Sequence, residues 1–117
     1  MSAETQLYTL LSGNAGVIAL VSTRIYPNLV PEEKTAPYIG YERVSTNPVG
    51  TLEGTILAEE AGIAVACWGK TPIQAAQVAD AVLAALSGTA WRFEGRNSEV
   101  DDSTQRHADT LQLTLST

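Results

Sequence analysis

His107 is the only histidine in the chain, so any mechanism that requires an imidazole must use it. A neighbouring acid could orient its ring and Ser103 could act as the nucleophile, which would give the three groups of a serine hydrolase. The acids available for this role are Asp101, Asp102 and Asp109. All of these residues lie in one polar segment and at the start of the strand that follows it, and no glycine-flanked turn presents the serine. We therefore interpret the segment as a solvated loop and expect no catalytic residue.

The same acidic segment could instead bind a divalent cation through carboxylate oxygens. The candidate ligands are Glu99, Asp101 and Asp102, but their spacing lacks the central glycine and the distal glutamate of a calcium-binding loop. Zinc requires several cysteine or histidine ligands, and the chain has one of each, Cys67 and His107, far apart in the sequence. We therefore expect no metal site.

Cofactor-binding patterns are missing as well. The glycines form neither G-x-x-x-x-G-K-[ST] nor G-x-G-x-x-G, the two common patterns that surround phosphate groups. Trp68 and Trp91 could stack on a ligand, but large aromatic side chains of this kind commonly lie in a core or an interface, and we interpret them in that way. The sequence predicts no cofactor.

Composition describes a single folded domain, residues 1–117, with 44% hydrophobic and 17% charged residues. Its 7 basic and 13 acidic residues give a formal net charge of −6, and the basic ones are scattered. A domain of this charge repels phosphate backbones and anionic lipids, so we expect no specific nucleic-acid binding and no membrane binding.

The start of the chain resembles no secretory signal, which predicts folding in the cytoplasm of the producing cell. Cys67 lies in an apolar run and is expected to be a buried, inert thiol.

Hydrophobic spacing predicts helices at residues 3–12, at 15–21 after a cap at Asn14, and most clearly after Thr71. In this last helix Pro72 takes the first position and Gln74 completes a T-x-x-Q capping box. An apolar stripe then runs to Leu86, and Gly88 ends the helix.

Extended segments are predicted from the aromatic and β-branched composition and from alternation. Residues 24–27 are extended, and the proline-bounded segment 28–36 is a loop. The strand predicted at residues 38–44 ends at 47–50. Residues 52–57 and 63–68 form a hairpin with a turn at 58–62. Two half-buried strands, at 90–94 and 110–115, flank a polar loop at 97–106.

These elements predict an α+β fold with a single antiparallel or mixed sheet of about 4–6 strands and two main helices packed on one face. The strand at 63–68 is apolar on both faces, which indicates a central position. The other face of the sheet combines two sets of residues. Thr110, Gln112 and Thr114 are expected to face solvent, whereas Ala64, Ala66 and Trp68 form an apolar area that could meet another protein.

Three stretches occur together in a recognisable order: RIYP at residues 24–27, PYIGYERVS at 37–45 and VACWGKTP at 65–72, which leads into the helix at 74–86. With the opening leucine-rich helix and the closing strand at 106–115, they cover nearly the whole chain. In this order and spacing the sequence resembles the phage tail-completion, or tail-to-head joining, proteins of long-tailed phages and prophages.

The resemblance implies a structural virion assembly protein with no enzymatic activity. Such a protein would cap the tail tube, act as a tail terminator, and join the tail to the head connector as a ring, commonly of six copies. Its partners would be further copies of itself, the tail tube protein and the head connector protein, and it would be located in the virion tail after assembly in the bacterial host cytoplasm. The acidic segments 32–34 and 59–60 depart from the family pattern.

We expect contacts between subunits at two elements, the hairpin at residues 52–62 and the loop at 97–106, because strand edges and hairpins offer unpaired backbone groups. The candidate contact residues are Leu52, Glu53, Thr55, Leu57, Asn97, Ser98 and Arg106. In a ring of negatively charged subunits, the repulsion between acidic side chains is tolerable only where these side chains face water. The candidates for the lumen or the outer rim are Glu59, Glu60, Asp101 and Asp102.

Two alternatives stay open at this point. One is a tail-tube subunit or another minor tail protein. The second is a small-molecule-binding or enzymatic α+β domain whose pocket is walled by Tyr38, Tyr41 and Trp91, with His107 or Asp109 as a polar anchor.

Overall fold

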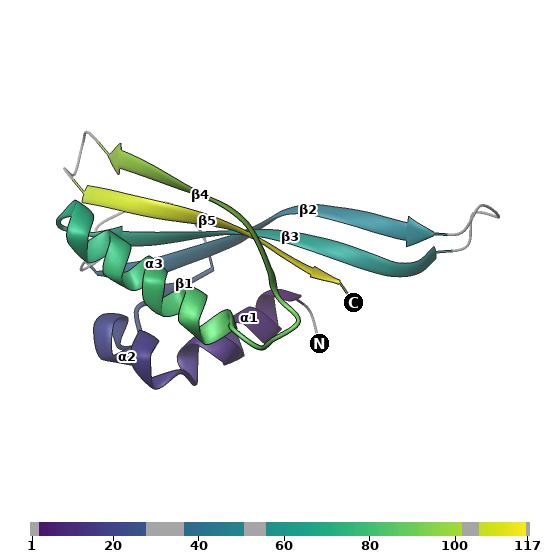
Figure 1. The fold of residues 1–117 in the computed structure, drawn as a ribbon, viewed down its shortest axis with the longest axis horizontal. Helices are drawn as coiled ribbons and strands as arrows, with labels where there is room; N and C mark the ends of the chain where they lie inside the picture. The colour runs from purple at the N-terminus through teal and green to yellow at the C-terminus, as the bar shows by residue number, and fades with distance from the viewer. Residues whose placement is uncertain (1–2, 28–36, 51–55, 102–105, 117) are drawn as a thin grey trace.

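The computed structural model describes residues 3–27, 37–50, 56–101 and 106–116. Its elements, in chain order, are α1 (Ala3–Ser12), α2 (Ala15–Val21), β1 (Ile25–Tyr26), β2 (Tyr38–Gly50), β3 (Ile56–Gly69), α3 (Pro72–Leu86), β4 (Arg92–Asp101) and β5 (Arg106–Ser116). The strands form one sheet in the order β1-β2-β3-β5-β4 (Figure 1). β1 pairs with β2 in parallel and the other neighbours are antiparallel. The predicted α+β class and the single mixed sheet are confirmed.

Local chemistry sets the ends of the helices where the sequence predicts them. The Asn14 side chain accepts a hydrogen bond from the Val17 amide at 3.1 Å and caps α2. Thr71 Oγ1 accepts one from the Gln74 amide at 3.1 Å and caps α3. Gln74 Oε1 in turn accepts a hydrogen bond from the Lys70 amide at 2.8 Å. After α3 the chain turns at Gly88, whose φ of 78° is readily adopted by glycine.

Replacing Thr71 with alanine is expected to lower the free energy of unfolding by about 1 kcal/mol, because the Gln74 amide loses its acceptor at the start of α3. Thr71→Ser keeps an oxygen at the same position and is expected to unfold at nearly the parent urea concentration. Urea titration followed by circular dichroism measures both variants. Equal midpoints for the two variants would contradict the role of the cap.

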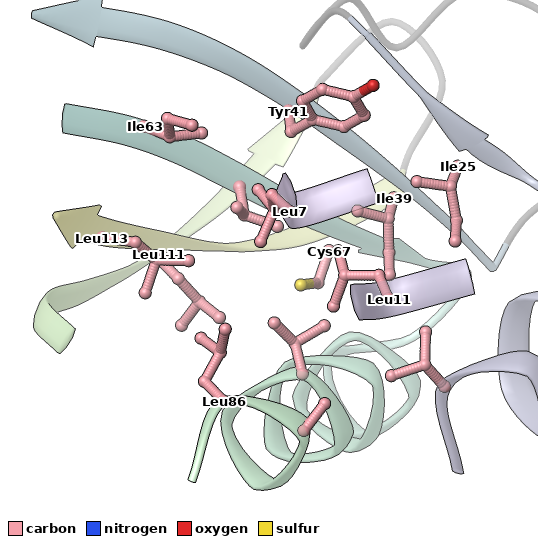
Figure 2. Packing of buried hydrophobic residues seen from close by; sticks show 14 of the residues in the cluster. Leu7, Leu11, Ile25, Ile39, Tyr41, Ile63, Cys67, Leu86, Leu111 and Leu113 are labelled. Carbon is pink, nitrogen blue, oxygen red and sulfur yellow. The ribbon is translucent and has the colours of Figure 1, made fainter. Parts of the chain in front are cut away.

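The core lies between the helices and one face of the sheet. Ile63 of β3, and Leu111 and Leu113 of β5, are at most 1% exposed and belong to the same buried cluster as Leu7 and Leu11 of α1 (Figure 2). α3 adds its apolar stripe to the same cluster, with its buried residues at Ala75, Val78, Ala79, Val82, Ala85 and Leu86. The expected packing of the helices on one face is confirmed. β3 is the central strand, as its two apolar faces predict.

Two strand boundaries around the hairpin were predicted wrongly. β2 does not stop at residues 47–50 but continues through Pro48, which pairs with Glu59. β3 is continuous from Ile56 to Gly69, so the predicted turn at residues 58–62 is part of a strand. These residues have low strand propensity, but β2 pairs with them on one side and β5 pairs with β3 from Glu60 onward. The hairpin is therefore formed by β2 and β3.

The prediction of a polar loop at residues 97–106 was also wrong for most of this segment. Residues 97–101 belong to β4, and Arg106 begins β5 and pairs with Asp101. β4 is an edge strand whose side chains are mostly exposed, so a polar sequence suits it as well as it suits a loop. Polarity alone could not distinguish the two.

Candidate assembly surfaces

β2 and β3 extend beyond the rest of the sheet as a two-stranded arm (Figure 1). The last pair between β3 and β5 is Glu60 with Ser116, so residues 56–59 pair with β2 alone. We call residues 48–50 and 56–59 the arm. At its base the register of β2 shifts between Arg43 and Ser45, and a Cβ at Gly62 would collide with Ser45 Oγ. The bulge and the glycine together set the direction in which the arm leaves the domain.

Some of the predicted contact and rim residues belong to the arm, and others do not. Leu52, Glu53 and Thr55 lie outside the described residues. Leu57 and Glu59 are in the β3 half of the arm. Glu60 is not at a turn; it is half-buried in β3, and its Oε2 lies 3.1 Å from Arg92 Nη2 of β4.

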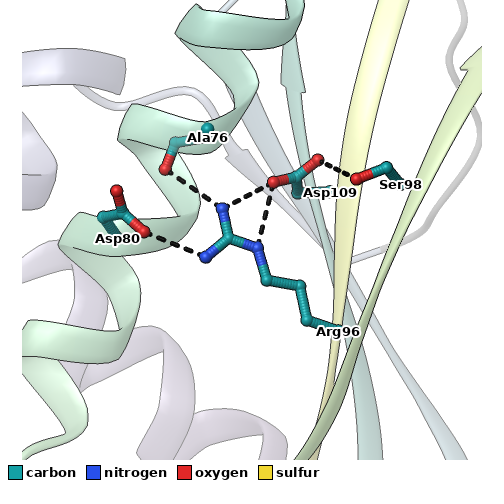
Figure 3. Close-up of polar contacts among 5 residues, drawn as sticks. All are labelled: Ala76, Asp80, Arg96, Ser98 and Asp109. Carbon is teal, nitrogen blue, oxygen red and sulfur yellow. Dashed lines mark hydrogen bonds and ion pairs between the residues drawn. The ribbon is translucent and has the colours of Figure 1, made fainter.

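A second group of polar residues ties β4 to the body of the domain (Figure 3). Arg96 of β4 donates from Nε and Nη2 to Asp109 Oδ2 of β5, at 3.0 and 2.6 Å. Its Nη1 donates to Asp80 Oδ1 of α3 at 2.9 Å, and Nη2 also approaches the Ala76 carbonyl at 3.5 Å. Ser98 Oγ donates to the other carboxylate oxygen of Asp109 at 3.0 Å. We call this group the Arg96 clamp.

The central ion pair of the clamp is largely buried. The Asp109 side chain is 10% exposed and that of Arg96 is 29% exposed, whereas Asp80 is 70% exposed. The hydrogen bonds to Asp109 and then to Asp80 raise the pKa of the Arg96 guanidinium above its usual value. Because the clamp joins three elements, it fixes the edge strand β4 relative to α3.

Sequence reasoning missed the clamp as a unit, although one signal for it was present. The alternation of Leu111, Leu113 and Leu115 puts Asp109 on the same, helix-covered face of β5. A carboxylate on a covered face needs a partner, because an unpaired buried charge is very costly. The partner itself, Arg96, came from the segment that was predicted to be a loop.

Two shallow hollows open on the surface of the described residues. One, of about 320 Å³, lies beside Trp91 and is lined mainly by Gln6, Thr9, Leu10 and Leu115. The other, of about 410 Å³, lies between α3 and the end of β4. Its lining includes Pro72, Ala76, Ser98, Val100, His107 and Asp109.

These positions separate the residues of the hypothetical small-molecule pocket. Trp91 lines the first hollow, and His107 and Asp109 line the second. Tyr38 belongs to a cluster on the helix-free face of the sheet, whereas Tyr41 packs in the core beneath α1. The structure therefore does not bring the predicted pocket walls and their polar anchor together.

The helix-free face carries an aromatic cluster. The Tyr38 ring stacks on Trp68 at 6.0 Å and meets Tyr26 edge-on at 5.9 Å. The guanidinium of Arg106, one of the predicted contact residues, lies 5.7 Å from the Tyr38 ring centroid. Trp68 is 6% exposed, which confirms its interpretation as a packed residue.

Two expectations for this face were wrong. Thr110 is buried, not solvent-facing, and its Oγ1 donates to Glu99 Oε1 at 3.3 Å. Ala64 and Ala66 are also buried, so the apolar area predicted there is not an exposed patch. Gln112 and Thr114 are half-buried.

The remaining predicted contact and rim residues that the structure describes lie in β4. Asn97 and Ser98 are exposed in β4, with Ser98 in the Arg96 clamp. Asp101 is the last residue of β4, and Asp102 lies outside the described residues.

Residues that could bind a metal ion do not cluster in the described part of the chain. No three histidine, cysteine, aspartate or glutamate side chains gather there in a way that could hold a metal ion. Burial raises the pKa of the Cys67 thiol well above its usual range, so this cysteine is an inert core residue. Among the described helices, none has the length and apolarity needed to cross a membrane.

Comparison with known proteins connects this architecture to a family. The family described as tail completion protein gp17 matches the chain over residues 5–115. A solved chain from the virion of a native gene transfer agent particle has the same fold, with a TM-score of 0.78 and 16% sequence identity over 94% of this chain and 90% of that chain. No curated protein sequence matches the chain significantly. The family match spans nearly every element of the fold, so the chain belongs to the tail completion proteins and is a structural protein of the phage virion tail.

Proposed function

We propose that this protein caps the tail tube of a long-tailed phage or prophage and joins it to the head connector as a ring. The observation that carries the proposal is the family match over residues 5–115. The structure supports it with features suited to assembly: a two-stranded arm beyond the sheet and a long edge strand held by the Arg96 clamp. Its partners are further copies of the chain, six in a ring, with the tail tube protein on one side and the head connector protein on the other.

The protein works by surface complementarity and carries out no reaction in this proposal. His107 and Asp109 share a hollow, but Asp109 is already bound by Arg96 and Ser98. A carboxylate that is occupied in this way orients β4 and does not serve the histidine. The predicted contact residues, from Leu52 to Arg106, remain candidates for joining the subunits.

Acidic side chains on the helix-free face support a channel that repels DNA. Glu42 and Glu99 are exposed and lie opposite Ala64 and Ala108, respectively, on that face. Together with the candidate rim acids Glu59, Asp101 and Asp102, they would line water in a closed ring. DNA would then pass without binding to the wall, because like charges repel. Glu60 is less suited to this role, since its carboxylate is paired with Arg92.

Electron microscopy of particles from which the protein has been deleted tests the proposal. We expect tails of excessive and variable length that carry no heads, and complementation with the parent gene should restore normal particles. Tails of normal length that fail to join heads would indicate a different minor tail protein. Particles of normal length with heads attached would overturn the proposal.

Salt dependence tests the placement of the acids. If they face water, raising the salt concentration is expected to favour the ring, because salt screens their repulsion over a Debye length of roughly 8 Å at physiological strength. Sedimentation at increasing salt measures this. A ring that dissociates in high salt would place the acids in ionic contacts between subunits.

His107→Ala is expected to complement the deletion as well as the parent gene does, because the histidine is half-buried at the edge of a hollow and has no assigned chemistry. Plaque counts or particle titres measure the outcome, with a thermal melt to show that the variant is folded. A folded His107→Ala protein that fails to complete tails would show that the imidazole has a function.

A further inference from the structure

The exposed large apolar side chains divide between the two outer edges of the sheet. Among the described residues they are Tyr8, Val44, Ile73, Phe93 and Val100. Val44 lies in β2, and Tyr8 of α1 contacts the β2 residue Tyr41 with ring centroids 6.5 Å apart. Phe93 and Val100 lie in β4, and Ile73 follows Pro72, which lines the same hollow as Val100. Single exposed apolar residues are common, so these positions carry weight only together with the other features of the two edges.

Both edges also offer backbone groups for pairing. β4 is the last strand of the sheet, with β5 as its neighbour on one side only. β2 pairs with β1 only at Ile39 and Gly40, so its outer side has no partner strand from Tyr41 to Gly50 within the described residues. Unpaired strand edges of this length readily accept another strand.

The helix layer differs between the two edges in a complementary way. At the β2 edge, α1 stands beside the strand and Glu4 Oε1 lies 2.7 Å from Arg43 Nη2. At the other edge, α3 packs chiefly on β3 and β5, and the hollow of about 410 Å³ lies between α3 and the end of β4. A second molecule that approaches β4 with its own β2 edge would bring a helix to the side where β4 lacks one.

The charges of β4 make an anionic partner a poor occupant. Arg92 is paired with Glu60 and Glu94, and Arg96 is paired with Asp109 and Asp80. Both arginines of the strand are thus neutralised within the chain. What the edge offers is backbone hydrogen bonding and apolar area.

We propose that the β4 edge surface (Ile73, Phe93 and Val100) binds the β2 edge surface (Tyr8 and Val44) of a second copy of this chain. The inference rests on the proposed ring and names its subunit contact. The two surfaces differ and lie on opposite edges, so the contact is head-to-tail, which is the kind that closes into a ring when the rotation between copies permits.

Thiol crosslinking of two single-cysteine additions tests the contact. Val44→Cys and Val100→Cys change side chains that are 57% and 53% exposed, so both variants should fold as the parent does. The native Cys67 is fully buried and does not compete for the reagent. A flexible bis-maleimide is added to each variant alone and to their mixture at high protein concentration, and the products are separated on a denaturing gel.

The mixture is expected to give a crosslinked 1:1 dimer, whereas each variant alone gives little. A protein that carries both changes should give a ladder of higher oligomers. Gln77→Cys, on an exposed position of α3, is the matched control and should not crosslink with Val100→Cys. A mixture that crosslinks no better than this control overturns the proposal. So does either single variant that dimerises as well as the mixture, since that result indicates a contact between identical edges.

The outcomes separate this inference from the function on which it rests. Crosslinks in the purified protein together with normal particles after gene deletion would overturn the proposed capping function but support the proposed contact. Over-long tails after deletion, without crosslinks in the mixture, would support the capping function but overturn the proposed contact.

Discussion

A Leu113→Asp variant is expected to lose its folded structure. Leu113 is 1% exposed and pairs with Ile63 of the central strand on one side and with Phe93 of β4 on the other. An unpaired carboxylate at this position costs several kcal/mol, which is a large part of the roughly 5–15 kcal/mol that stabilises a domain of this kind. The cooperative thermal transition seen by circular dichroism should disappear.

The control for this change is the neighbouring residue on the same strand. Gln112 is half-buried and points to the opposite face, so Gln112→Asp is expected to keep a cooperative transition at a slightly lower temperature. If Leu113→Asp instead melts like the parent and Gln112→Asp unfolds, the register of β5 is shifted by one residue.

Loss of Arg96 is expected to have the second-largest effect. Arg96→Ala leaves the Asp109 carboxylate, 10% exposed, with only the Ser98 hydroxyl as a partner. Removing one partner of a fully buried ion pair costs roughly 3–5 kcal/mol, and about 2–3 kcal/mol is expected here because 29% of the Arg96 side chain is exposed. Urea titration of the parent and the variant measures this difference.

Two further variants show whether the buried charge causes the loss. Adding Asp109→Asn to Arg96→Ala removes the unpaired charge and should recover part of the stability. Arg92→Ala breaks ion pairs at the surface, where they contribute little, and should unfold near the parent midpoint. Similar losses for Arg92→Ala and Arg96→Ala would contradict the structural role of the clamp.

Elements with local chemical signals could be predicted from the sequence. The caps at Asn14 and Thr71, the proline after Thr71 and the glycine at residue 88 fix the helix ends through hydrogen bonds and backbone geometry within a few residues. The leucine alternation of β5 likewise placed Leu113 in the core. These signals depend on nearest neighbours, so a sequence contains them in full.

The arm and the edge strand could not be predicted, because their structure depends on pairing between distant segments. Residues 58–62 have the composition of a turn, yet they are held as a strand by residues 45–49 and, from Glu60 onward, by β5. The Arg96 clamp joins residues from β4, β5 and α3, and no local pattern links them. The family resemblance suggested the overall function, but it did not place these contacts.

The position of β5 in the sheet has a consequence for how the protein is made. β5 is the last strand to be synthesised, and it lies between β3 and β4, which leave the ribosome earlier. Until it emerges, β4 has no neighbour, Asp109 is not available to Arg96, and the apolar strand β3 is open along one side. The sheet therefore closes only after β5 has left the ribosome, and a nascent chain that stalls before Arg106 would expose a long unpaired strand edge to chaperones or to other nascent chains.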